Sequence, residues 1–368
     1  MAIKTSGPIS LGNIQAEFGG TAPHSLREYY RDGSYISKNN TKIPLIGSPY
    51  APAINKFSNY YGAEFLVKIG YQIIAGGGGS GGWGNTAGTL LGGGGGGGGG
   101  VLEGKELWLP LGTYNVTVGL GGVAGAAKQS GSNGGNSSIS HATRIMNTVA
   151  IGGGGGGGID LPGKDGGSGG GGGLSSSITV KTARGGCVPG QGNMGGFGFS
   201  KKGSTFDGIA GSLTVPVAYR GSGGGGGYKG AGVPYEGTWG NWSSYSWTEG
   251  NVGGMGGACF SAGGGGSTDT EVSVHGYAPG MGYSQCKGFN FPGYGGQCWF
   301  KTSGDYVNIM NGTAGEVWIN AYEIRKNNGY SQNRKIIFTP VNATLVDNGS
   351  FGPDWRFTSN GTFTISVE

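Results

Sequence analysis

The chain has 368 residues, of which 92 are glycine and only 12% are charged. A glycine content of one in four is typical of collagen or disorder, but no strict G-x-y period occurs and the charge is too sparse for a solvated disordered chain. The 8 Trp, 18 Tyr and 14 Phe residues exceed what a flexible linker carries. The net charge of +5, with no basic run longer than two residues, gives no support for nucleic-acid binding.

The N-terminal sequence has no apolar core of signal-peptide length, and no stretch of about 18 apolar residues occurs in the chain. These features predict a soluble product that is made in the cytoplasm without a secretion signal.

Glycine is sparse in residues 1–63, which predicts a separate small α+β module. Ser10 is a suitable N-cap for a short helix through Ile14 and Phe18 that closes at Gly19-Gly20. Further short helices are predicted at residues 25–30 and 53–62. A module of this size is too small to be catalytic and is suited to docking on a larger assembly.

This module also contains an imperfect internal repeat. The residues concerned are Ile3, Gly7, Ile14 and Phe18, echoed by Ile43, Gly47, Ile54 and Phe57. The first two spacings match and the last slips by one residue, so the pattern indicates either two similar hairpin-and-helix pieces or a coincidence among common residues.

Residues 64–315 alternate between β-like runs and pure glycine. Strands are predicted at residues 65–69, 71–74, 114–118 and 177–180 from their β-branched and aromatic content. The glycine runs are residues 76–79, 92–100, 152–158, 169–173, 223–227 and 263–266.

Nine consecutive glycines favour neither a helix nor a strand, because each loses maximal backbone entropy and adds no side chain. Extended, left-handed polyglycine-II helices would recover this loss, since backbones without Cβ atoms can approach closely enough to bond one another. At about 3.1 Å per residue, nine residues span roughly 28 Å. The alternative is that the runs are flexible linkers.

Ordinary strand composition resumes in residues 316–368, at residues 316–319, 334–339 and 362–367, with turn signals at 347–349 and 359–361. These strands are predicted to complete or cap the preceding domain. The predicted fold is therefore mainly β: a small N-terminal module followed by a glycine-rich β-sandwich with packed polyglycine-II helices.

No catalytic or metal-binding constellation is found. His24, His141 and His275 lie more than 100 residues apart, without a neighbour at metal-ligand spacing. Matches to G-x-G-x-x-G are frequent but lack a βαβ context, and Asp269 with Glu271 are adjacent acids in a loop-like stretch. We therefore expect neither an enzyme nor a cofactor or metal site.

Clustered aromatic residues among Asn, Ser and Gly are the strongest candidates for a binding site, because rigid rings give contact area at low entropic cost. They are Tyr228, Tyr235, Trp239, Trp242, Tyr245, Trp247, Tyr283, Phe289, Phe291, Tyr294 and Trp299. The alternative for the first six is a lid that covers the glycine segments.

Two weaker features accompany the aromatic clusters. Residues 183–202 carry Arg184, Lys201 and Lys202, which could meet phosphates or simply be solvated. Cys286 and Cys298 could close the second aromatic loop by a disulfide, or they could remain thiols as Cys187 and Cys259 could.

The order of several motifs carries a family resemblance. They are Ile73-Ile74-Ala75 with Gly76 to Gly79, Leu107 to Gly122, Asn133 to Ile139, and Ile151 with Gly152 to Gly158. This order resembles the glycine-rich domain of phage tail proteins. The glycine runs alternating with aromatic loops resemble tail-fibre tip adhesins of T-even-type phages.

The resemblance implies a bacteriophage tail component in the virion that attaches to a host receptor through its aromatic loops. The receptor would be a bacterial outer-membrane protein or surface polysaccharide, and residues 1–63 would dock on other tail proteins. A purely structural tail component is the alternative. Fibres are usually trimers whereas tip adhesins act as single caps, so a homo-oligomer and a single copy both stay open.

Overall fold

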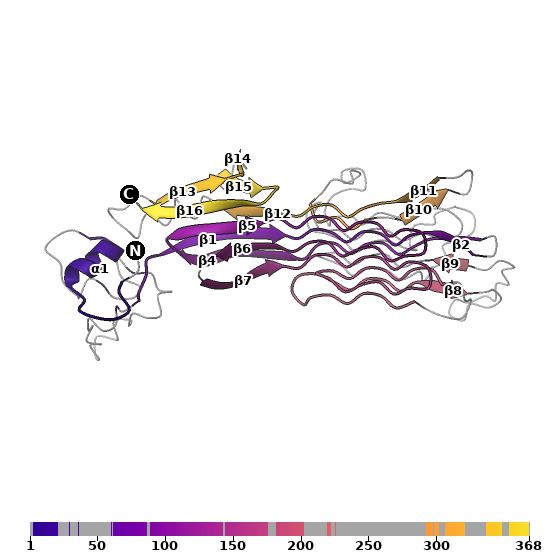
Figure 1. The fold of residues 1–368 in the computed structure, drawn as a ribbon, viewed down its shortest axis with the longest axis horizontal. Helices are drawn as coiled ribbons and strands as arrows, with labels where there is room; N and C mark the ends of the chain where they lie inside the picture. Colours follow the sequence, from indigo (N-terminus) through magenta and orange to yellow (C-terminus); the bar gives the residue numbers. More distant parts are fainter. Residues whose placement is uncertain are drawn as a thin grey trace, which may run out of the picture.

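A computed structural model gives the architecture of the chain. The structure describes residues 3–20, 29, 36, 60, 62–86, 89–142, 144–175, 182–201, 219–221, 225, 292–296, 298–301, 306–320, 336–347 and 353–367. The molecule is elongated, with a short helix at one end, two β-sheets next to it and a bundle of extended segments beyond them (Figure 1). The prediction of a mainly β chain is thus confirmed.

Helix α1 (Leu11–Phe18) begins and ends at the residues expected from its caps. The Ser10 hydroxyl accepts the Asn13 N–H at 3.2 Å, and the Asn13 side chain accepts the Ser10 N–H at 2.9 Å. This reciprocal capping box satisfies two donors at the helix start. Gly19 ends the helix with φ 81°, and its N–H donates to the Gln15 carbonyl at 2.7 Å. The predicted helices at 25–30 and 53–62 lie almost entirely outside the described residues.

Buried polar contacts tie α1 to the start of the first sheet. The carboxylate of Glu17 accepts the Phe65 N–H at 2.8 Å, and the Tyr29 hydroxyl donates to the Gly19 carbonyl at 2.8 Å. The Tyr60 hydroxyl donates to the carbonyl of Tyr29. Burial raises the pKa of Tyr60 to about 12, and the nearby Tyr29 makes a smaller contribution in the same direction. The helix therefore docks on the body through hydrogen bonds that are shielded from water.

The first sheet is antiparallel and has the strand order β14-β15-β12-β1-β4. Its strands are β1 (Leu66–Ile74), β4 (Val101–Pro110), β12 (Glu316–Asn320), β14 (Thr344–Asp347) and β15 (Pro353–Phe357). The two runs predicted at 65–69 and 71–74 form one continuous strand, because Gly70 keeps its pairing with Asn320.

The second sheet is also antiparallel, with the order β13-β16-β5-β6-β7. Its strands are β5 (Gly112–Thr117), β6 (Ser137–His141), β7 (Arg144–Ala150), β13 (Ile336–Val341) and β16 (Gly361–Val367). Strands near the C-terminus therefore pair with strands from the first half of the chain in both sheets, as the pairings β12 with β1 and β16 with β5 illustrate.

The two sheets share one hydrophobic core. Alternate side chains point into it from both sheets, for example Val67 and Ile69 from β1 and Phe363 and Ile365 from β16. The ring of Tyr114 stacks on Phe363 at 5.0 Å between centroids. This period of two is the pattern of strands with one buried face.

Among the described residues, three two-stranded sheets of short strands lie at the end of the molecule far from α1 (Figure 1). They pair β2 (Gly84–Thr86) with β3 (Thr89–Leu91), β8 (Phe199–Lys201) with β9 (Tyr219–Gly221), and β10 (Cys298–Lys301) with β11 (Tyr306–Ile309). The predicted strand at 177–180 lies outside the described residues, as does the second copy of the predicted repeat. Across the described ranges, no helix is long and apolar enough to span a membrane.

Candidate functional site

Extended segments continue the strands of both sheets toward the far end of the molecule (Figure 1). In the described part of the chain they include residues 75–83 (segment 1), 92–100 (segment 2), 118–127 (segment 3), 129–136 (segment 4), 151–158 (segment 5), 161–167 (segment 6), 168–174 (segment 7), 292–296 (segment 8) and 310–315 (segment 9). Strands β1, β5 and β7 lead directly into segments 1, 3 and 5. Segments 2, 4 and 9 lead back into β4, β6 and β12.

Segment 1 donates its backbone N–H groups to three neighbours in strict rotation. Residues 75, 78 and 81 donate to segment 2, residues 76, 79 and 82 to segment 4, and residues 77 and 80 to segment 9, at N···O distances of 2.8–3.1 Å. Each neighbour is reached again after three residues. The partner numbers fall along the chain, so all three neighbours run antiparallel to segment 1.

The carbonyl groups of segment 1 follow the same three-residue period. Residues 76 and 79 accept from segment 5, residues 77 and 80 from segment 3, and residue 78 from segment 8. Segment 1 therefore has six bonded neighbours. Each of these is also hydrogen-bonded to the next around the ring, in the order segments 2, 5, 4, 3, 9 and 8.

Glycine is required at the centre of this arrangement because the backbones leave no space for a side chain. A Cβ atom on Gly78 would lie 2.2 Å from the Gly154 carbonyl oxygen, and one on Gly77 would lie 2.1 Å from the Tyr294 carbonyl oxygen. Both positions are far inside ordinary van der Waals contact. The hydrogen bonds between close backbones thus offset the entropic cost of ordering glycine.

The large apolar side chains of segment 3 are found where this segment faces solvent. On segment 3, Leu120 and Val123 are 75% and 62% exposed. The adjacent row of Gly119, Gly122 and Gly125 faces segment 4, where an added Cβ would lie 2.0–2.1 Å from a carbonyl oxygen. The three-residue period therefore decides which positions of a segment tolerate a side chain.

A row of polar side chains with this same spacing lies on segment 4. Ser130, Asn133 and Asn136, hereafter the polar ladder, accept the N–H groups of Gly158, Gly155 and Gly152 of segment 5 at 3.2, 2.9 and 2.9 Å. The amide nitrogen of Asn133 also donates to the Asp165 carbonyl in segment 6 at 2.8 Å. Sequence reasoning missed these residues as a functional set, although their i, i+3, i+6 spacing is visible in the sequence.

The sequence matches the family model of a glycine-rich domain over residues 60–322. The chain belongs to this glycine-rich domain family. The matched range holds β1 to β12 with segments 1 to 9, whereas α1 and strands β13 to β16 lie outside it. Comparison with curated proteins gives no match.

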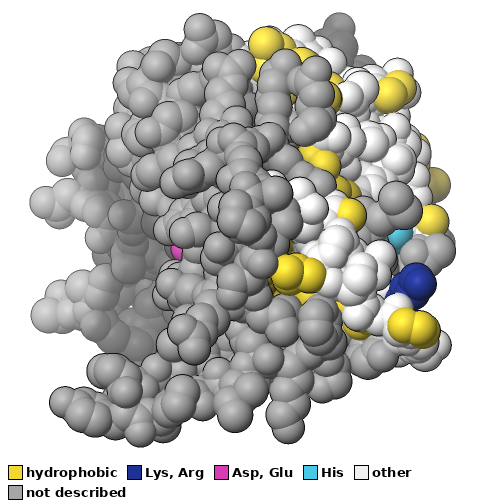
Figure 2. Space-filling model, turned by 90° about the vertical axis from the view of Figure 1, so that its left-hand side faces the viewer, with side chains coloured by type: hydrophobic (Ala, Val, Ile, Leu, Met, Phe, Trp, Pro, Cys, Tyr) yellow, Lys and Arg dark blue, Asp and Glu magenta, His cyan; other side chains and the backbone are white. Residues whose placement is uncertain are grey.

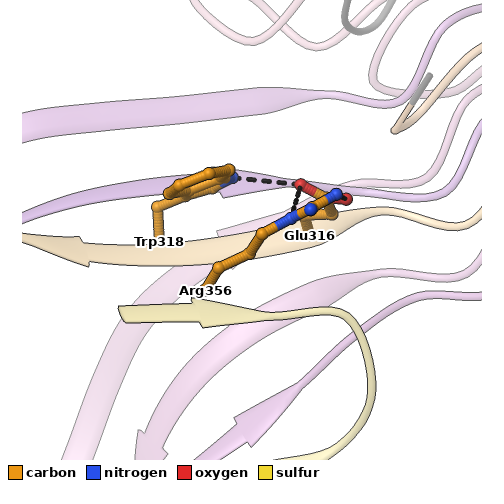
Figure 3. Close-up of polar contacts among 3 residues, drawn as sticks. All are labelled: Glu316, Trp318 and Arg356. Carbon is orange, nitrogen blue, oxygen red and sulfur yellow. Dashed lines mark hydrogen bonds and ion pairs between the residues drawn. The ribbon is translucent and has the colours of Figure 1, made fainter. Parts of the chain in front are cut away.

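An ion pair lies at the point where segment 9 leads into β12 of the first sheet. Figure 3 shows Trp318 and Arg356 converging on the carboxylate of Glu316, the first residue of β12. The Arg356 Nε donates at 3.0 Å and its Nη2 forms a second bond, while the Trp318 indole N–H donates at 3.1 Å. The hydrogen bond to Glu316 raises the pKa of Arg356. The carboxylate is nearly buried, so this pairing compensates its desolvation.

At the far end of the glycine-rich domain, tight turns reverse the chain. Lys128 and Asp160 adopt positive φ angles of 63° and 60° between segments 3 and 4 and between segments 5 and 6. Ile159 and Leu174 form a small second hydrophobic cluster there, and the Ser175 hydroxyl donates to the Asp160 carboxylate at 3.2 Å. These contacts cover the ends of the segments.

Two of the predicted binding residues fall within the described residues. Tyr294 in segment 8 is only 5% exposed; its N–H donates to the Thr313 hydroxyl at 2.7 Å and its carbonyl accepts the Thr313 N–H at 2.8 Å. Trp299 lies in β10, paired with Asn308. The others, at positions 228, 235, 239, 242, 245, 247, 283, 289 and 291, lie outside the described residues, so their role stays a prediction.

The basic residues and the cysteines, which are the weaker candidates from the sequence, lie partly within the described residues. The Arg184 guanidinium lies over the Phe197 ring at 4.6 Å from its centroid, which is a cation–π contact. Cys187 is a half-buried free thiol, whereas Cys259 and Cys286 lie outside the described residues. Among the described residues, no group of three His, Cys, Asp or Glu side chains could hold a metal ion.

On the surface seen from the helix end, the described residues present few charged side chains. Figure 2 shows hydrophobic side chains scattered singly among uncharged polar and backbone atoms on its described part. Scattered apolar side chains are ordinary on protein surfaces and do not form a patch that marks a partner.

Proposed function

We propose that the glycine segments are polyglycine-II helices. A left-handed extended helix with three residues per turn points successive N–H groups in three directions, with the carbonyl groups between them. The rotation of segment 1 among six neighbours, with every neighbour repeated after three residues, is what this geometry produces. The backbone contacts of Gly77 and Gly78 support the same conclusion, since only glycine permits such close packing.

We further propose that the protein is a bacteriophage tail protein that attaches the virion to the host-cell surface. The resemblance of the motif order in residues 73–158 to tail proteins supports this function. Residues 1–63 would bind other tail proteins, and the aromatic loops would bind an outer-membrane protein or a surface polysaccharide. Several copies per particle would convert weak contacts into stable attachment.

The observation that carries the proposal is the closed ring of hydrogen bonds around segment 1. A bundle bonded in all directions across its axis is stiff, and binding residues act best on loops that a rigid scaffold positions. Such a bundle would hold loops at a distance from the helix end, where the N-terminal module would dock.

Binding of the fluorescently labelled chain to intact Gram-negative cells tests this function. We expect the parent to bind and the triple variant Trp239→Ala, Trp242→Ala and Trp247→Ala to lose binding while its circular dichroism spectrum stays unchanged. Val123→Ala is the matched control, because it removes an exposed apolar side chain from the bundle and leaves the loops intact.

Absence of binding by the folded parent to any susceptible host would refute the adhesin function and favour the alternative, a structural tail component without receptor contact. Equal loss of binding in the Val123→Ala control would show that the loops are not the specific contact.

A further inference from the structure

Within the described part of the chain, segment 5 has backbone neighbours on five sides. It donates to or accepts from segments 1, 2, 4, 6 and 7, and each of these contacts recurs after three residues. For example, Gly153 and Gly156 donate to segment 1, and Gly154 and Gly157 donate to segment 7. Segment 1 shows that a complete ring has six members.

The sixth position around segment 5 lies between segments 4 and 6, and the polar ladder fills it. Three further N–H groups of segment 5, at residues 152, 155 and 158, donate to ladder oxygens at 2.9–3.2 Å. The ladder also reaches segment 6, through the bond from Asn133 to the Asp165 carbonyl. Side chains from segment 4 therefore supply acceptors at the spacing at which another glycine segment would supply carbonyl groups.

The outer side of the ladder faces solvent. Asn133 and Asn136 are exposed and Ser130 is half-buried, whereas Gly152, Gly155 and Gly158 beneath them are buried. Without the ladder, this edge would present three N–H groups at a regular three-residue spacing. An unpaired row of backbone donors is a template for a further chain, just as the edge of a β-sheet is.

We propose that the polar ladder closes the open edge of segment 5 and so prevents a glycine segment of a second copy of this chain from adding to the bundle. The three side chains satisfy the donors that such a segment would use, and their bulk occupies its place. A second copy is the fitting partner because its own glycine runs have the required period and lack Cβ atoms.

The test replaces the ladder with glycine, in the variant Ser130→Gly, Asn133→Gly and Asn136→Gly. Sedimentation velocity over a hundred-fold concentration range should show assemblies larger than those of the parent, growing with concentration. The matched control is Asn133→Leu with Asn136→Leu, which keeps the bulk but removes the acceptors. This control should keep the parent's sedimentation behaviour.

Amide hydrogen exchange at Gly155 gives a second readout that does not require the triple variant to fold. Loss of one hydrogen bond should accelerate exchange about five- to ten-fold in Asn133→Leu. Exchange should stay at the parent rate in Asn133→Asp, which retains an acceptor oxygen.

Each result of these measurements either supports or overturns the proposed role of the polar ladder. A folded glycine variant that sediments as the parent does, or a leucine control that associates equally, would overturn the proposal. If the glycine variant does not fold, equal exchange at Gly155 in Asn133→Leu and Asn133→Asp would overturn it, and the predicted difference would support it. None of these measurements involves host cells, so their failure is distinct from failure of the adhesin function.

Discussion

Replacing Gly78 by alanine places a methyl group in the centre of the bundle. The new Cβ would lie 2.2 Å from the Gly154 carbonyl oxygen, whereas an ordinary contact begins at 3.4 Å. Segments 1 and 5 must then separate by about 1.2 Å, the difference between these two distances. Their hydrogen bonds at residues 153 and 156, now 2.8 and 2.9 Å long, would be broken.

The cost follows from these two bonds. Breaking these two bonds leaves four buried backbone groups without a partner, and at about 1–3 kcal/mol for each group the cost is about 4–12 kcal/mol. Reduced chain entropy in the unfolded state returns only about 0.4–1 kcal/mol. Since a domain is stable by about 5–15 kcal/mol, Gly78→Ala should unfold at a much lower denaturant concentration or fail to fold.

Denaturant unfolding followed by tryptophan fluorescence and circular dichroism measures this loss. Gly12→Ala in α1 is the matched control, because its Cβ would meet nothing closer than the Ser10 hydroxyl at 3.6 Å. Alanine in a helix interior should stabilise it by roughly 0.5–1 kcal/mol. A Gly78→Ala variant as stable as the parent would refute the close backbone packing.

Three further changes test individual contacts. Ser168→Gly should leave the free energy of unfolding unchanged or raise it, because the buried Ser168 hydroxyl has no hydrogen-bond partner within the described chain. Ser80→Gly should lower the free energy of unfolding by about 1 kcal/mol, because it removes the acceptor of the Met310 N–H. Equal effects of the two variants in thermal melts would contradict this difference. Arg356→Met should lower the free energy of unfolding by about 1–3 kcal/mol, because the nearly buried Glu316 carboxylate loses its cation. In the same melts, adding Glu316→Gln should recover part of this lost stability, because it removes the unpaired charge. The raised pKa of Tyr60 means that its ionised form is disfavoured in the folded state, so stability should fall as pH rises from 10 through 12; this slope should be shallower in Tyr60→Phe, and identical slopes would argue against it.

Local sequence was sufficient for the elements whose signals are local. Ser10 and Gly19 define the ends of α1 because capping involves only neighbouring residues. The runs predicted as strands at 65–69, 71–74 and 362–367 lie almost entirely within β1 and β16, because alternation of apolar residues suits a sheet with one buried face. The glycine runs at 76–79, 92–100, 152–158 and 169–173 favoured close backbone packing over the alternative of flexible linkers, and the structure shows such packing.

Sequence reasoning did not reach the polar ladder, although its spacing is visible in the sequence. Asn and Ser beside glycine are typical of turns, so a row of them at every third position carries no meaning until the period of the neighbouring segment is known. The polar ladder has a role only because segment 5 lies beside segment 4, with its N–H groups at the same three-residue spacing.

The sequence by itself determined that the chain is mainly β, where its single described helix begins and ends, and which segments carry no side chains. Only the tertiary structure decided which segments are neighbours. A glycine run has no side-chain pattern to specify its partner or register, because sliding it by three residues restores the same bonds. Partner and register are fixed instead by the strands that lead into the segments and by the few polar side chains between them, and these act across long distances in the sequence.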